Sequence, residues 1–236
     1  MESLNRPYPV TLPMILLVAL VPLYVFIPEL ANGRAVHGPE IRLDRVIPLQ
    51  PVWALIYGGP YLFLILLPVF VLRRREHIRR TVLAYLLIWI TAYVFFIAYP
   101  TAAPRPAEVS GEGFAVTGLR FLYGADPPYN CFPSLHVAHS FVSALACFPV
   151  HRRLGIAATL CAALVAISTL FTKQHYVLDV VAGALLACVA YAVFLRSYRE
   201  PVPELDRRLA PALALSVAGI VGALAAAAWV LYFVNA

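Results

Sequence analysis

The sequence has little charge for its length and almost no lysine. Charged residues make up 13% of its 236 residues, and Lys173 is the single lysine among 18 basic residues. A soluble domain is ordinarily about one quarter charged and about half apolar, whereas this chain is 62% hydrophobic. These values argue against an ordinary soluble domain. They favour a chain that spans a lipid bilayer, where each helical span needs about 20 apolar residues.

The chain also lacks any cysteine pattern that indicates a metal site or a disulfide framework. Its four cysteines include no C-x-x-C pair; three lie within apolar runs, and Cys131 stands alone in a predicted loop. No internal repeat, low-complexity tract or alternation of basic and aromatic residues is visible. The net charge of +6 is therefore assigned to membrane loops, and we expect no nucleic-acid partner.

Seven apolar segments predict the membrane spans. They cover residues 12–31, 51–72, 81–100, 133–150, 154–172, 175–195 and 209–234. The fourth is short and contains polar residues. The first is long enough to span, so we expect a retained anchor and not a cleaved signal peptide. The predicted fold class is all-α: a single polytopic membrane helix bundle over residues 1–236, with a six-helix core and an additional C-terminal span at about 209–234.

Loop charge predicts the orientation of this bundle. If residues 73–80 are cytoplasmic, then the N-terminus, residues 151–153 and residues 196–208 are cytoplasmic as well. These four stretches hold 12 of the basic residues, and the opposite side holds 6. Because cytoplasmic loops are enriched in Lys and Arg, this bias predicts a cytoplasmic N-terminus. The connection from 101 to about 131 then lies outside, and its length is typical of a functional loop.

Polar residues concentrate in three stretches, and the predicted topology places all three at the outer face. They are residues 99–106 after the third span, residues 130–136 before the fourth, and residues 168–179 between the fifth and the sixth. Ionisable residues inside or beside apolar spans are functional candidates. The three stretches are far apart in sequence, so their common membrane depth points to one site.

The residue types in these stretches suit phosphoryl transfer. His175 and Asp179 are spaced i, i+4, so on a helix the carboxylate can orient the imidazole. The free ring nitrogen is then available as a nucleophile. His136 is a second imidazole that can protonate a leaving oxygen. Arg105 offers a planar fork for phosphate oxygens, and Lys173 adds a point charge near the same surface.

Two further polar residues have weaker patterns. His139 lies three residues after His136, so the pair could bind a metal together with Asp179. No further ligand pattern accompanies them, and polar packing is the simpler interpretation. Asn130 either shapes the loop before the fourth span or donates a hydrogen bond to phosphate.

The three stretches resemble the signature motifs of the type 2 phosphatidic acid phosphatase superfamily, which run K-x6-R-P, P-S-x-H and S-R-x5-H-x3-D. The second motif is complete at 133–136. The third matches at Ser168, His175 and Asp179 with the correct spacing, and the first matches at Arg105 and Pro106. The resemblance covers about residues 81–195, the catalytic half of the predicted bundle.

This resemblance implies a role for each matching residue. His175 would accept the phosphoryl group, Asp179 would orient it, and His136 would act as general acid. Arg105 and the backbone around Ser134 would bind phosphate oxygens. Ser168, Lys173 and Asn130 complete the set of predicted phosphate-binding residues. Neither a metal nor another cofactor is expected in this family.

Two departures from the motifs bear on the substrate. Ala98 stands where the first motif has lysine, and Thr169 stands where the third has arginine. Lys173 could compensate for one of these cations. A phosphodiester carries less negative charge than a phosphomonoester, so a less cationic site favours a diester. In this respect the chain resembles the sphingomyelin synthase and inositol phosphorylceramide synthase branch of the superfamily.

The sequence therefore predicts a membrane lipid phosphotransferase with a phospholipid donor and a lipid or polyol acceptor. The alternative is a lipid phosphate or polyprenyl diphosphate phosphatase. A transporter is a third hypothesis, but an internal repeat is lacking and the polar residues do not lie at midplane. Short loops and the use of arginine over lysine favour a bacterial inner membrane with the site on the periplasmic face. The sequence leaves head group, acceptor and oligomeric state open.

Overall fold

A computed structural model describes residues 35–235, and their regular structure is helical. The predicted segment 12–31 lies outside the described residues. The helices are α2 (Arg42–Val46), α3 (Trp53–Val71), α4 (Arg75–Ala98), α5 (Phe114–Ala125), α6 (Leu135–Cys147), α7 (Arg152–Phe171), α8 (Val177–Ala190) and α9 (Glu204–Asn235). A π-helical turn, η2 (Tyr191–Leu195), continues α8.

Five of the described helical segments are long and apolar enough to cross a membrane. They are Trp53–Val71, Arg75–Ala98, Arg152–Phe171, Val177–Leu195 and Glu204–Val234. The remaining predicted segment within the described residues, 133–150, forms the shorter apolar helix α6 (Leu135–Cys147). The prediction of an all-α, polytopic membrane bundle is confirmed. Helices α4 and α9 begin several residues earlier than the predicted spans, because they take in basic residues assigned to loops.

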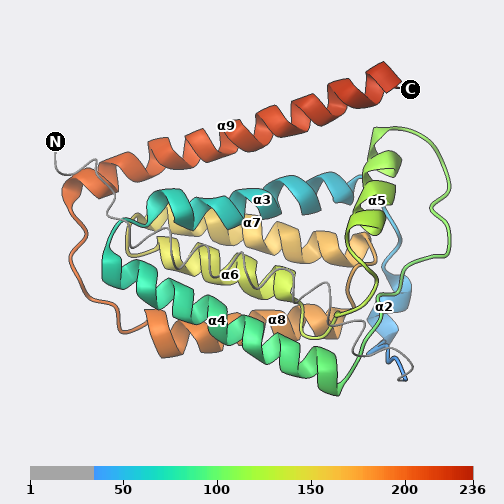
Figure 1. Ribbon diagram of the computed structural model, residues 1–236, viewed down its shortest axis with the longest axis horizontal. Helices are drawn as coiled ribbons and strands as arrows, with labels where there is room; N and C mark the ends of the chain where they lie inside the picture. The colour runs from blue at the N-terminus through green and yellow to red at the C-terminus, as the bar shows by residue number, and fades with distance from the viewer. Residues whose placement is uncertain (1–34, 236) are drawn as a thin grey trace.

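Helices α3, α4, α6, α7 and α8 run alternately up and down as one bundle (Figure 1). The connections after α3, α6 and η2 lie at one end of it. The connections after α4 and α7 lie at the other, together with α2 and α5. All three predicted polar stretches therefore lie at one end of the bundle. We call this the α5 end. We call the opposite end, which holds the arginines of residues 73–80, 151–153 and 196–208, the basic end.

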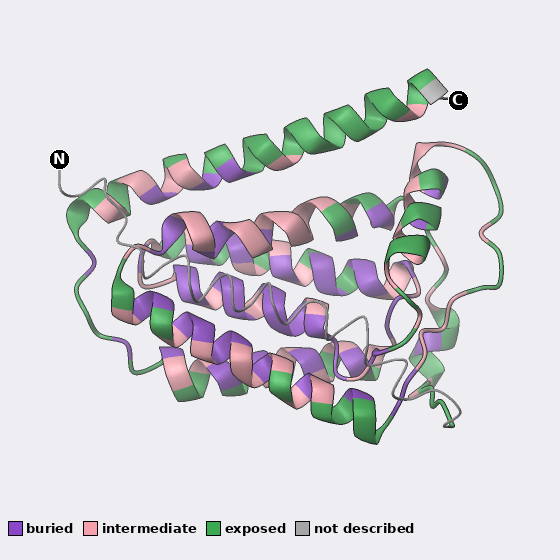
Figure 2. Cartoon of the chain, in the orientation of Figure 1, coloured by how far each residue is buried: buried purple, intermediate pink, exposed green. Residues whose placement is uncertain are grey.

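Helix α6 occupies the centre of the bundle, and Figure 2 shows most of it buried. It can lie there because small side chains allow its neighbours to approach closely, as in other membrane helix pairs. The fully buried small residues on α6 and its neighbours include Ala138, Ala144, Ala146, Ala158, Ala162 and Ala187. The short length of α6 is thus compatible with a central position.

Helix α8 approaches the start of α6 closely at Gly183. A Cβ atom added to Gly183 would lie 2.5 Å from the carbonyl oxygen of Ser134 and 3.2 Å from the Cβ of Val137. Any side chain at position 183 would therefore push the two helices apart. Glycine at this position lets α8 lie directly against the residues that begin α6.

Helix α9 lies along α3, outside the five-helix bundle (Figure 1). Its first half contributes Ala210, Ala214 and Val217 to the buried residues. Its second half is exposed and apolar, with large side chains at Leu224, Trp229, Leu231, Phe233 and Val234. An exposed apolar helix of this length is expected to lie in lipid, which agrees with its prediction as an additional span.

The long connection between α4 and α6 is more regular than the sequence suggested. It contains α5, and its arms form isolated bridges between His37 and Thr101 and between Ala102 and Tyr129. The main-chain amide of Ala103 donates to the carbonyl of Pro128 over 2.7 Å. Residues that follow α4 are thereby fixed beside residues that precede α6.

Candidate active site

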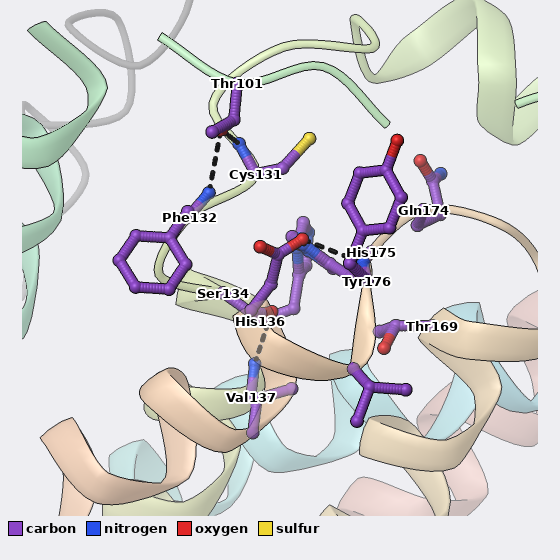
Figure 3. A network of polar contacts seen from close by, with 12 residues as sticks. Thr101, Cys131, Phe132, Ser134, His136, Val137, Thr169, Gln174, His175 and Tyr176 are labelled. Atoms are coloured by element: carbon purple, nitrogen blue, oxygen red, sulfur yellow. Dashed lines mark hydrogen bonds and ion pairs between the residues drawn. The ribbon is translucent and has the colours of Figure 1, made fainter. Parts of the chain in front are cut away.

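Three helix termini bring the predicted catalytic residues together at the α5 end. His136 is the second residue of α6, His175 lies in the turn between α7 and α8, and Asp179 is the third residue of α8. Figure 3 shows His136 and His175 together, with Cys131 and Ser134 nearby. Asp179 is fully buried and His175 is nearly so.

The carboxylate of Asp179 contacts both His175 and the start of its own helix. Its Oδ2 atom lies 3.4 Å from Nδ1 of His175 and accepts the main-chain amide of Tyr176 over 2.8 Å. The second contact satisfies one of the amides that every helix N-terminus leaves unpaired. The carboxylate is therefore held by the backbone while it orients the imidazole.

The two imidazoles face each other. Nδ1 of His136 lies 3.3 Å from Nε2 of His175, and the ring planes are inclined at 59°. Nε2 of His175 is the ring nitrogen that Asp179 leaves available. A group bound to it would lie within reach of His136, which is the geometry that nucleophile and general acid require.

Backbone contacts connect the motifs to one another. The amide of Ser134 donates to the carbonyl of Asp179 over 3.0 Å, directly joining the starts of α6 and α8. The hydroxyl oxygen of Thr101 accepts the amides of Cys131 and Phe132, both over 3.0 Å (Figure 3). The first two stretches are thus fixed to each other by a side chain that the motif comparison did not single out.

Arg105 is held at the edge of the site by several acceptors. Nη1 donates to the carbonyls of Asp126 and Tyr123 over 2.7 and 3.2 Å, and Nη2 donates to Oε1 of Gln174. The guanidinium also stacks on the Tyr123 ring, 4.5 Å from its centroid. Burial raises the pKa of Tyr123 to about 12, with Arg105 opposing the shift. Because Gln174 directly precedes His175 in the chain, its contact with Arg105 fixes the guanidinium to the turn that carries His175.

Lys173, Ser168 and Asn130 lie around the site but have other partners or constraints. The Lys173 ammonium donates to the main-chain carbonyl of Asp44 over 3.0 Å. The buried Ser168 hydroxyl donates to the carbonyl of Val165 over 2.6 Å. Asn130 is buried with a φ of 62°, a left-handed conformation that asparagine tolerates. For these three residues, phosphate binding stays a prediction.

Ser134 caps the helix that carries His136. Its side chain accepts the amide of Val137 over 3.4 Å, as expected of serine at a helix N-terminus. Thr169, which replaces the arginine of the third motif, is fully buried, and its hydroxyl donates to the carbonyl of Ala166 over 2.7 Å. Ala98, which replaces the lysine of the first motif, ends α4 and is exposed.

Tyr57 and Asp44 contact the site residues and were not predicted from the sequence. The Tyr57 hydroxyl, on α3, lies 2.7 Å from Nε2 of His136. Asp44, on α2, accepts the amide of Val177 at Oδ1 and that of Ile41 at Oδ2, both over 2.8 Å. Neither residue belongs to a motif. Only the apolar run around Tyr57 indicated a helix, and nothing in the sequence indicated which helix would face His136.

A possible metal-binding group lies beside the histidine pair. Ligand atoms of Cys131, His175 and Asp179 lie within 4.8 Å of one another, and within the described part of the chain this is the one such group found. Burial, followed by the Asp179 charge, raises the pKa of the Cys131 thiol well above its ordinary value, which disfavours the thiolate that metals require.

His139, which the sequence offered as a metal ligand together with His136 and Asp179, does not belong to this group. Its ring stacks on the ring of Tyr85, with 4.3 Å between the centroids.

Comparison with known proteins identifies the family. The model of the PAP2 superfamily matches residues 40–193, which is more than half of the chain and includes both histidines. The chain therefore belongs to the PAP2 superfamily, and the family resemblance seen in the motifs is confirmed at that level.

One curated relative illustrates how distant the similarity is. A PA-phosphatase related-family protein of Dictyostelium discoideum is 30% identical over 123 residues, covering 45% of this chain and 22% of that protein. The chain thus matches less than a quarter of that relative's length. No solved structure matches the chain. Family membership supports a membrane enzyme with lipid phosphatase or phosphotransferase activity.

Proposed function

We propose that this protein is a membrane lipid phosphotransferase that transfers a phospho-head group through a phosphohistidine. The observation that carries this proposal is the alignment of Asp179, His175 and His136, in which Nε2 of His175 lies 3.3 Å from Nδ1 of His136. A carboxylate-oriented nucleophile next to a second imidazole is the arrangement that two-step group transfer requires.

In the first step, Nε2 of His175 attacks the phosphorus of a phospholipid and a nitrogen–phosphorus bond forms. The bond between phosphorus and the oxygen of the lipid alcohol breaks, and protonated His136 gives its proton to that oxygen. Asp179 stabilises the positive charge that develops on the His175 ring. The products are the free lipid alcohol and the phospho-head group bound to His175.

In the second step, the hydroxyl of an acceptor lipid or polyol replaces the departed alcohol. His136, now neutral, removes the hydroxyl proton as the oxygen attacks phosphorus. The nitrogen–phosphorus bond breaks, and His175 returns to its starting state. One histidine thus acts as acid in the first step and as base in the second.

The weak positive charge around the histidines supports a diester substrate. The guanidinium of Arg105 donates to Gln174 and to two main-chain carbonyls, and it lies 3.8 Å from a carboxylate oxygen of Asp126. The Lys173 ammonium donates to the main-chain carbonyl of Asp44. Positions 98 and 169 hold alanine and threonine. A dianionic monoester would therefore meet less compensating charge than a diester with a single negative charge. The same observation is our reason for proposing a relation to the sphingomyelin synthase and inositol phosphorylceramide synthase branch.

A phosphatase is the second candidate, and the name of the Dictyostelium relative, a PA-phosphatase related-family protein, favours it. Its first step would be the same, and water would replace the acceptor alcohol in the second. The substrate would be a lipid phosphate or a polyprenyl diphosphate. The two candidates therefore differ in the substrate that forms the phosphohistidine and in the nucleophile that resolves it.

Charge at the two ends of the bundle supports the proposed orientation. Arg73 pairs with Asp206 and Arg80 pairs with Glu76 at the basic end. Arginines gather there from α4, α7 and α9, as expected for a cytoplasmic surface. We place the α5 end, with the histidines, on the non-cytoplasmic face. A bacterial inner membrane with the site facing the periplasm is the proposed location.

A transfer assay tests this function. Purified protein is added to vesicles of phosphatidylcholine, phosphatidylethanolamine and phosphatidylinositol carrying ³²P in the head-group phosphate, with and without ceramide and diacylglycerol. We expect labelled lipid product that depends on the acceptor and is absent in His175→Ala. His151→Asn, which preserves the cap of α7 at the basic end, is the control. Acceptor-independent release of labelled, water-soluble head-group phosphate, or of inorganic phosphate from matched vesicles that carry a labelled lipid phosphate, would instead establish hydrolysis.

A further inference from the structure

Tyr57 joins the histidine pair from a helix outside the three motifs. It lies on α3, is 3% exposed, and places its hydroxyl 2.7 Å from Nε2 of His136. Three contacts join Tyr57, His136, His175 and Asp179 into a hydrogen-bonded chain. The contact between Tyr57 and His136 is the shortest; the two histidines are 3.3 Å apart, and His175 and Asp179 are 3.4 Å apart. Both nitrogens of His136 therefore have a partner.

The direction of each hydrogen bond in this chain follows from its carboxylate end. Ionised Asp179 can only accept, so Nδ1 of His175 must carry a proton. When His175 is neutral, its Nε2 is then an acceptor, and the facing Nδ1 of His136 must donate. When His136 is neutral as well, its Nε2 is an acceptor, and the Tyr57 hydroxyl donates to it. One tautomer of each imidazole is consistent with all three contacts.

We propose that Tyr57 is a positioning residue that occupies Nε2 of His136, so that Nδ1 is the nitrogen that exchanges protons with the reacting oxygens. The inference rests on the proposed function, in which His136 acts as acid and then as base. Asp179 orients His175 by binding one ring nitrogen and leaving the other for phosphorus. Tyr57 binds one ring nitrogen of His136 in the same way and leaves the other for the reacting oxygens.

A hydroxyl suits this position better than a carboxylate would. His136 alternates between imidazolium and neutral imidazole during the two proposed steps. A tyrosine hydroxyl is both donor and acceptor. It donates to Nε2 in the resting enzyme, where the His136 proton is on Nδ1, and it accepts from Nε2–H once His136 is an imidazolium or has given its Nδ1 proton to the leaving oxygen. A carboxylate would stabilise the imidazolium and hinder release of its proton. Tyr57 therefore keeps the ring oriented without fixing its charge.

The packing of His136 allows the hydroxyl to be tested separately from the ring. The rings of Tyr57 and Tyr61 lie 5.0 and 4.8 Å from the His136 ring, measured between centroids. Tyr57→Phe removes the hydrogen bond and retains the aromatic contact. Tyr85→Phe is the matched control, because it removes a buried tyrosine hydroxyl bonded to Ser143 over 2.8 Å, away from His136.

Nitrogen NMR of the full-length protein in detergent micelles tests the proposal without any substrate. The imidazoles are labelled with ¹⁵N, His136 is assigned from its absence in His136→Gln, and spectra are recorded at alkaline pH, where imidazole is neutral. We expect the proton on Nδ1 in the wild type and in Tyr85→Phe. In Tyr57→Phe we expect it on Nε2 or divided between both nitrogens. A wild-type proton on Nε2, or an unchanged spectrum in Tyr57→Phe, would overturn the proposal.

Turnover of the ³²P-labelled phospholipid vesicles gives the second readout. Tyr57→Phe should lower kcat about 10- to 100-fold, part of what general acid catalysis contributes, with KM nearly unchanged. Tyr85→Phe should keep the wild-type kcat. A Tyr57→Phe enzyme with wild-type kcat would contradict the proposal even if the tautomer changed. Activity in His175→Ala would instead refute the proposed function, and the NMR result would still decide the tautomer.

Discussion

The main-chain amide of Ser134 donates to the main-chain carbonyl of Asp179 over 3.0 Å. This one hydrogen bond joins the residue before α6 to the first turn of α8. His136 follows Ser134 by two residues, and His175 precedes Asp179 by four. The spacing of the two imidazoles therefore depends on how closely α8 approaches the start of α6.

Gly183 sets that approach, so Gly183→Ala should separate the histidines. The new Cβ would lie 2.5 Å from the Ser134 carbonyl oxygen, and backbone atoms must move to relieve the contact. We expect a loss of about 1–3 kcal/mol of stability, as for other overpacked cores, and a fall in kcat of at least about tenfold. Thermal denaturation in detergent and initial-rate kinetics measure the two effects.

Gly222→Ala is the control for this substitution. Gly222 lies on α9, and no described atom comes within 4 Å of its added Cβ. Alanine there should keep wild-type activity and melting temperature or raise the latter slightly. Wild-type activity in Gly183→Ala would show that the two helices do not need this close approach.

Arg105→Lys should weaken substrate binding although the charge is retained. Lysine cannot reproduce the planar fork that contacts Gln174 and two carbonyls, nor the stacking on Tyr123. The expected loss in kcat/KM is on the order of 10- to 100-fold, the effect of one hydrogen bond to a charged group. Arg120→Lys is the control, because Arg120 binds only loop carbonyls at an exposed position. Equal kinetics for both variants would remove Arg105 from the site.

Asp44→Ala should loosen the turn that carries His175. The substitution leaves the amides of Val177 and Ile41 without their acceptor, at a cost of about 1–3 kcal/mol. Hydrogen exchange of residues 172–177 should rise and kcat should fall. Glu40→Ala removes only an exposed pair with Arg45 and should change neither. Unchanged exchange in Asp44→Ala would show that α2 does not support the turn.

Removal of metals should leave turnover unchanged. The proposed steps use only imidazoles, a carboxylate and cationic side chains, although Cys131, His175 and Asp179 lie close enough to share an ion. Activity after dialysis against EDTA, compared with activity after readdition of Zn²⁺, Mg²⁺ or Mn²⁺, measures this. Loss on chelation and recovery with one ion would contradict a metal-independent reaction. Cys131→Ser would then show whether that ion uses this group.

Local patterns in the sequence predicted the span helices because apolar runs of this length have few alternatives in a membrane. The grouping of His136, His175 and Asp179 at one end followed from alternating helix direction. The helices α2 and α5 were missed, because they are five and twelve residues long and neither contains an apolar run long enough to mark a span. The early start of α4 was also missed: the pair of Glu76 with Arg80 stabilises a turn that loop charge had assigned to solvent.

Contacts between distant segments were not predictable in the same way. Tyr57 is one of several tyrosines in apolar runs, and only the packing of α3 against α6 shows that it faces His136. Thr101 and Asp44 likewise act through backbone amides 30 and 133 residues away. Residue type gives no indication of such partners, because any amide at the right place would serve.

The covalent step on His175 is the central claim, and trapping the intermediate tests it most directly. Protein is mixed with the ³²P-labelled phospholipid vesicles without acceptor, quenched in alkali, which preserves phosphohistidine, and digested for mass spectrometry. The predicted result is label on the peptide that contains His175, its discharge on addition of acceptor, and no label in His175→Ala. Turnover by the wild type with no labelled His175 peptide, or label retained in His175→Ala, would contradict the proposed mechanism.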